Sequence, residues 1–149
     1  MVSWSQFSAN APELAAFGQR RLESRIAYLA TIRLDGSPRL HPVSPFIASG
    51  KLYVYMEPTS PKGHDLRRDG RYAMHGGVED NSGGQGEFLI QGRAVEVSDT
   101  ETRAEAFAQA RERGYDPQER YILFELKVAE ARASVYECGK AKRESWKAA

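Results

Sequence analysis

The chain has 149 residues, of which 41% are hydrophobic and 28% charged, a composition typical of one globular domain over residues 1–149. Its formal net charge of +1 lacks the strong basic excess of proteins that bind nucleic acid by neutralising phosphates, so that class is excluded. The chain has a single cysteine and no metal-binding motif, which predicts neither an intrachain disulfide nor a metal site. It also lacks a signal peptide and an apolar run of roughly 18 residues, so we expect a cytoplasmic protein without a membrane helix.

The first predicted helix covers about residues 11–24. Asn10 stands before its first turn, and Glu13 follows three residues later, which is typical of a capped helix start. Pro12 is tolerated there because the first-turn N–H groups have no intrahelical partner. We therefore expect Asn10 to cap this helix.

An antiparallel meander is predicted after this helix. A strand begins at residue 26, and Asp35-Gly36 is a hairpin signal between two apolar runs. The return strand is expected over 39–48. A turn at Ser49-Gly50 then leads to a third strand over 51–57.

The segment TSPKGHDLRRDGR, residues 59–71, predicts a short helix that begins at Ser60 and Pro61 and ends near Gly70. Lys62 in its first turn opposes the helix dipole and is unfavourable for the helix alone. Unpaired N–H groups, the Ser60 hydroxyl and Lys62 together suit an anion. An exposed cap with a solvated lysine accounts for the same residues equally well, and both interpretations stay open.

Strands are predicted again in the second half of the chain. They are expected at 71–76 and 87–97, with a bulge at Gly92, and as a long strand over 121–137. The last residues, 144–149, predict a short edge strand.

The clearest helix is predicted over 98–114. Ser98 and Glu101 form a capping box, and Gly114 is a typical helix terminator. In total, about six mostly antiparallel strands and three helices predict a mainly β, α+β fold or a small barrel.

Two motifs occur in a recognisable order. LATIRLDGSP, residues 29–38, precedes a strand pair, and the segment from Ser60 to Arg71 follows it. The stretch GRAVEV then precedes a predicted helix. In this order of motifs the chain resembles the pyridoxamine 5′-phosphate oxidase-like superfamily of flavin-binding split β-barrels. Trp4 and Phe7 near the start and Glu144-Ser145-Trp146 near the end resemble its actinobacterial type. The resemblance implies a split antiparallel barrel that forms a homodimer. It also implies FMN, or alternatively the deazaflavin coenzyme F-420, at the subunit interface.

The resemblance also implies roles for individual residues. Ser60 and Lys62 would bind the cofactor phosphate, and Trp146 would contact the flavin. The residues expected along the ring or its cleft are His41, Pro42, Val43, Ser44, Tyr55 and Met56. Tyr53 is expected on the opposite face of its strand from Tyr55. No side chain is assigned as a catalytic acid or base, since the flavin itself would exchange hydride with a small organic substrate.

Several positions depart from the oxidase pattern. Pro61 stands where the oxidase has an arginine beside its phosphate-binding lysine, and Glu87 stands where a glutamine faces the flavin. Only three residues follow Trp146, where the oxidase has its substrate-binding arginine and histidine. We expect a flavin-dependent oxidoreductase with a different substrate. The alternatives are a non-enzymatic flavin or haem binder, with His75 as a candidate axial ligand, and a dimeric scaffold without a cofactor.

Overall fold

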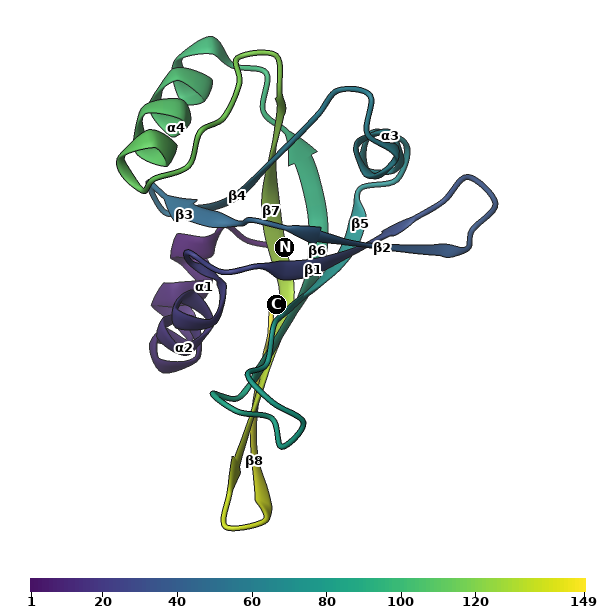
Figure 1. Ribbon diagram of the computed structural model, residues 1–149. Coiled ribbons are helices and arrows are strands. Elements are labelled where there is room, and N and C mark those ends of the chain that lie inside the picture. The colour runs from purple at the N-terminus through teal and green to yellow at the C-terminus, as the bar shows by residue number, and fades with distance from the viewer.

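The computed structural model describes residues 1–149 as one twisted antiparallel sheet of eight strands with four helices packed around it (Figure 1). The predicted mainly β, antiparallel class is confirmed, although six strands and three helices were expected. The strands are β1 (Ala27–Ile32), β2 (Pro38–Val43), β3 (Phe46–Ala48), β4 (Lys51–Met56), β5 (Arg71–Gly76), β6 (Glu87–Glu96), β7 (Ile122–Glu137) and β8 (Lys140–Lys147), and the helices are α1 (Trp4–Asn10), α2 (Pro12–Leu22), α3 (Pro61–Arg68) and α4 (Thr100–Glu112).

The order of strands shows how the sheet closes. Neighbours follow the path β2-β1-β5-β6-β7-β4-β3, so β2 and β3 form its two ends. Only Ser44 and Pro45 separate these strands in the chain, which means that the sheet must curl until its two edges approach each other. The single strand predicted over 39–48 is therefore wrong, because Pro45 has no N–H for a continuous ladder. The curled sheet is consistent with a barrel that is split between β2 and β3.

The long strand β7 shares one of its edges among three partners. Its start pairs with β4, and its end pairs with β8. Between them, Val2 exchanges two backbone hydrogen bonds with Val128, at 3.0 and 2.8 Å. The far end of the β7–β8 hairpin projects away from the sheet (Figure 1). The predicted last strand over 144–149 is β8, which begins four residues earlier, at Lys140, and ends at Lys147.

Two predicted helix caps are wrong by one residue or more. Asn10 ends α1, a helix that was not predicted, and its amide donates to the Gln6 carbonyl; Ala11 stands at the start of α2 without a side-chain cap. In α4 the cap is Asp99 rather than Ser98, because its carboxylate accepts the Thr102 N–H at 2.8 Å.

None of the four helices has both the length and the apolar composition needed to cross a bilayer.

The main core of 24 buried residues lies between the curled sheet and the pair α1 and α2, and it includes Phe7 and Met56. A second cluster of six packs α4 against β3 and β4. Tyr53 of this cluster and Tyr55 beside it both pack on Phe46, with ring centroids 5.4 and 5.6 Å away. The prediction that these two tyrosines point to opposite faces is wrong, because residues two apart on a strand point to the same side.

Candidate functional site

A cavity of about 280 Å³ opens where the sheet is split. It lies at the end of β2, beside β4, against the first turn of α3 and under the loop that follows α4. Its lining residues are Pro42, Val43, Ser44, Tyr55, Lys62, Tyr115, Asp116, Pro117 and Tyr121. Five of the ten residues expected to bind a cofactor are therefore brought together here, although they come from three separate segments of the chain.

The first turn of α3 presents a positive charge to this cavity. The predicted cap is confirmed, since the Ser60 hydroxyl accepts the Gly63 N–H at 3.2 Å. Pro61 has no N–H, and the N–H of Lys62 has no intrahelical acceptor. The Lys62 side chain is half-buried, and no carboxylate forms an ion pair with it; burial lowers the pKa of its ammonium group. An unneutralised, partly desolvated cation at a helix start suits an anionic group.

One turn after Lys62, α3 is anchored by a buried carboxylate. Asp65 is 2% exposed and accepts hydrogen bonds from the Thr31 hydroxyl and the Arg39 Nε, both at 2.7 Å, and from Arg68 at 3.1 Å. Burial alone would raise the pKa of Asp65, but these three hydrogen bonds outweigh it and the pKa is lowered. Asp65 therefore ties α3 to β1 and β2. Thr31 of the LAT motif and Arg68 of the DLRRD segment serve this link.

His41 lies beside this charged layer. Its pKa is lowered, first by burial and then by the positive charges of Lys62 and Arg39, against a smaller opposing effect of Asp65. The imidazole is therefore neutral near pH 7. The structure places His41 next to the cavity lining rather than within it.

The aromatic wall of the cavity includes a polar atom without a partner. The Tyr55 hydroxyl is buried and makes no hydrogen bond, and burial raises the pKa of this group, so it remains a donor at neutral pH. Tyr121 packs near its ring, with centroids 6.4 Å apart. Tyr115 donates a hydrogen bond to the Pro45 carbonyl at 2.8 Å. Sequence analysis missed Tyr115 and Tyr121, because only the folding of a distant loop onto β2 and β4 brings them here.

Three expected site residues lie elsewhere. Met56 points into the main core, on the opposite side of β4 from Tyr55. Trp146 packs on Phe7 with ring centroids 5.0 Å apart, which accounts for its partial burial within the chain. Glu87 lines a different cavity of about 420 Å³, where its carboxylate accepts a hydrogen bond from the Tyr136 hydroxyl at 2.6 Å.

His75 also lines this 420 Å³ cavity, together with Arg132 and Arg143. Its Nδ1 donates a hydrogen bond to the Gly76 carbonyl, which can only accept, and its Nε2 has no hydrogen-bond partner. No group of three or more histidine, cysteine or carboxylate side chains is close enough to hold a metal ion. His75 is the only histidine among the residues that line this cavity.

Solved structures of known proteins share this fold. The conserved hypothetical protein Rv2991 of Mycobacterium tuberculosis is 22% identical, with a TM-score of 0.67 over 83% of this chain and 82% of that one. The haem storage protein HutZ of Vibrio cholerae is 20% identical, with a TM-score of 0.63 over 79% and 89%. A haem-binding protein of Mycobacterium smegmatis is 17% identical, with a TM-score of 0.65. That match includes 89% of this chain but only 57% of the haem-binding protein. At these identities the likeness shows the fold alone.

Sequence comparison gives the family directly. No curated protein matches the chain significantly. The sequence profile of the pyridoxamine 5′-phosphate oxidase family, however, matches residues 11–134, which include all of β1 to β6 and the whole candidate cavity. The chain therefore belongs to the pyridoxamine 5′-phosphate oxidase family.

Proposed function

We propose that this protein binds a phosphorylated flavin in the cavity at the split of the sheet and exchanges hydride between that flavin and a small organic substrate. FMN is the first choice, and the deazaflavin coenzyme F-420 is the alternative. Lys62 is the main support, because it is a half-buried cation without an ionic partner, at a helix start that opens onto the cavity. The flavin ring, when bound, supplies the hydride chemistry.

The residues around the cavity fit such a group. Lys62 and its N–H would hold the phosphate, and the unpaired Tyr55 hydroxyl would donate to a carbonyl or nitrogen of the ring. Tyr121 supplies an aromatic surface, and Pro117 is buried beside it and helps to exclude water. The neutral His41 adds no second positive charge next to the anion.

The size of the cavity supports the proposal that the active form is a homodimer. At about 280 Å³ it falls just below the range of roughly 300–1,000 Å³ that is usual for ligand pockets, so a second chain would complete it. Tyr28 and Leu40 lie close by on the outer face of β1 and β2, 46% and 65% exposed, and would be covered by the second copy. Sedimentation equilibrium tests this directly; a monomer at all concentrations would contradict it.

Replacing Lys62 with alanine is expected to weaken FMN binding by about 1–3 kcal/mol, as for the loss of a charge-assisted hydrogen bond. Titration of apoprotein with FMN, followed by flavin fluorescence, measures this, with the deazaflavin coenzyme titrated in parallel. Lys140→Ala is the matched control, because Lys140 is exposed on the β7–β8 hairpin, far from the cavity. Equal affinities of the Lys62→Ala variant and the wild type would remove the start of α3 as the phosphate site.

Haem binding is the second candidate function, since two proteins of the same fold are described as binding or storing haem. The Nε2 of His75, which has no hydrogen-bond partner and lies in a cavity with two arginines, favours it here, because arginines suit propionate groups. Under this candidate, a haemin titration gives a shifted absorption band that is lost in His75→Ala but kept in His64→Ala, whose imidazole is exposed on α3. Flavin binding without such a band would eliminate haem; binding of neither would favour a scaffold without a cofactor.

A further inference from the structure

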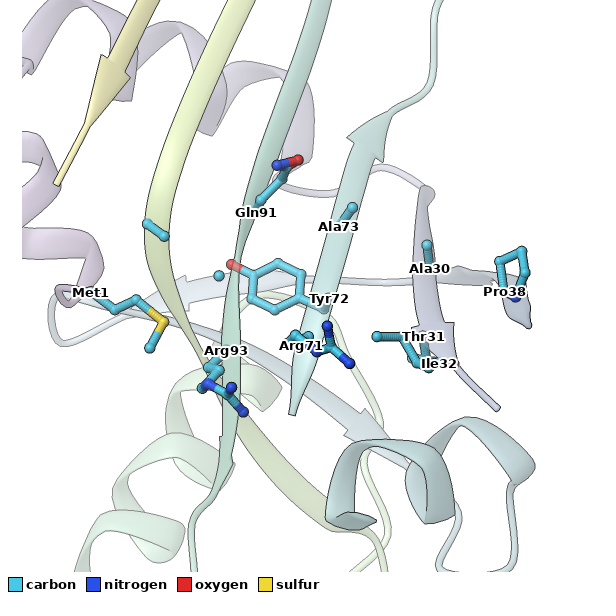
Figure 2. A pocket seen from close by; sticks show the side chains of 12 residues that line it. Met1, Ala30, Thr31, Ile32, Pro38, Arg71, Tyr72, Ala73, Gln91 and Arg93 are labelled. Atoms are coloured by element: carbon cyan, nitrogen blue, oxygen red, sulfur yellow. The ribbon is translucent and has the colours of Figure 1, made fainter. Parts of the chain in front are cut away.

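Arg103 differs from every other arginine of the chain. It is the only arginine that is not exposed to solvent and yet forms no ion pair. Figure 2 shows the more common situation in Arg93, which also lacks an ion pair but is exposed among the residues that line a cavity of about 430 Å³. Water compensates the charge of an exposed guanidinium, whereas a half-buried one has to be stabilised by the protein.

The position of Arg103 in its helix is also unfavourable. It lies in the first turn of α4, where the helix dipole carries partial positive charge. Its guanidinium is held by carbonyl oxygens alone, because it donates to Tyr121 at 2.8 Å and makes longer contacts of 3.4 Å with Glu119 and Val97. Lys62 opposes the dipole of α3 in the same way. Such conflicts with local rules are typical of functional sites.

The loop that Arg103 holds is part of the flavin cavity. Tyr115 fixes the first half of this loop, residues 113–121, to the segment between β2 and β3, and Arg103 fixes the second half. Arg120 also pairs with Glu57, but this ion pair is exposed and contributes little to stability. The loop supplies four of the nine residues that line the cavity: Tyr115, Asp116, Pro117 and Tyr121.

The charge of Arg103 reaches the wall of the cavity. It lowers the pKa of the buried Tyr55 hydroxyl, although the larger effect of burial raises this pKa. Arg103 also lowers the pKa of Glu96, but the carboxylate of Glu96 is already paired with Arg67 at 2.7 Å. The positive charge beside Tyr55 therefore has no carboxylate partner.

We propose that Arg103 is a positioning residue of the flavin site, which fixes the loop 113–121 and keeps a positive charge behind Tyr55. This inference rests on the proposed flavin function. The fixed loop holds the ring of Tyr121 at the cavity and so sets the shape of the space that a flavin ring would occupy. Hydride transfer to a flavin adds negative charge to its ring, and a nearby cation favours that reduced form. Arg103 does not line the cavity itself, so it acts through the loop and through its charge.

Hydrogen exchange of the apoprotein, followed by mass spectrometry, tests the hold on the loop without any flavin. Arg103→Gln removes charged hydrogen bonds, so the amides of residues 113–121 should exchange about tenfold faster or more. Arg103→Lys keeps the charge but lacks the fork of donors, and its loop should also exchange faster. Arg111→Gln removes the same charge from an exposed position on α4 and should behave like the wild type. Exchange in β6 should stay unchanged in all variants, which separates a local effect from unfolding. Unchanged loop exchange in Arg103→Gln would overturn the proposal.

The reduction potential of bound FMN tests the role of the charge. Arg103→Gln should favour reduced over oxidised flavin about tenfold less than the wild type does, which lowers the potential of this two-electron couple by about 30 mV. Arg103→Lys should keep a potential near that of the wild type although its loop exchanges faster, and Arg111→Gln should match the wild type in both measurements. Equal potentials in Arg103→Gln and the wild type would refute the role of the charge. If the wild type bound no FMN, the proposed flavin function would fail, whereas the exchange experiment would still decide whether Arg103 holds the loop.

Discussion

Replacing Asp65 with alanine is expected to lower the free energy of unfolding by about 3 kcal/mol, near the lower end of the cost of breaking a buried ion pair. The carboxylate is 2% exposed, and its removal leaves Arg39 and Arg68 without a counter-charge and Thr31 without an acceptor. The lower end applies because both guanidinium groups are partly exposed and can regain water. Urea unfolding followed by circular dichroism measures the difference.

Asp69→Ala is the matched control for this prediction, because Asp69 lies at the other end of the same short segment. Its carboxylate forms an ion pair with Arg71 on the surface, so its loss should change the free energy of unfolding little. Equal losses for the two variants would show that the buried network around Asp65 does not anchor α3.

The same network predicts a pH dependence. The pKa of Asp65 is lower in the folded chain than the usual value of about 3.9, so the folded state favours the ionised carboxylate. Its contribution to stability is complete above that usual value and is lost as the pH falls through the lowered pKa of the folded state. Between pH 6 and 3, roughly spanning that range, the wild type should therefore lose more stability than Asp65→Asn. Parallel curves would contradict the prediction.

Much of the fold was predictable because the relevant signals are local. The Asp35-Gly36 turn, the Ser60-Pro61 helix start and the Gly92 bulge each depend on residues within one turn or strand. The errors arose where local signals compete. Asn10 looked like a cap, but Ser3 and Gln6 form a complete capping box seven residues earlier, and the helix that they start ends at Asn10.

The candidate site was predictable only in part, for a related reason. Lys62 carries a signal of its own, since its charge opposes the helix that contains it. Tyr115 and Tyr121 carry none, because their place depends on a contact between Tyr115 and Pro45, 70 residues apart. In the sequence, Asp65 and Arg68 look like an ordinary pair of charged residues on a helix surface. Nothing near them indicates that the Asp65 carboxylate is buried against Thr31 and Arg39, which are more than 20 residues away.

Gly92→Ala is expected to destabilise the fold by about 3 kcal/mol or more, at or beyond the upper end of the usual cost of overpacking. Residue 92 lies where the register of β6 and β7 shifts by one residue, which brings the two backbones together. A Cβ at this position would overlap the backbone carbonyl oxygen of Lys127, and a backbone atom in the centre of a sheet cannot move aside as a side chain can. Thermal and urea unfolding measure the loss.

Gly77→Ala separates this steric effect from the general effect of replacing a glycine. Gly77 has no positive φ, and the nearest atom to a Cβ there is the Ile26 carbonyl oxygen at 3.4 Å, which is an ordinary contact. This variant should therefore be about as stable as the wild type, or slightly more stable, because alanine reduces the conformational freedom of the unfolded chain. If Gly92→Ala left the free energy of unfolding equally unchanged, β6 and β7 would have to move apart at the bulge without losing stability. The bulge would then be a flexible joint in the sheet rather than the point that fixes the register between its two longest strands.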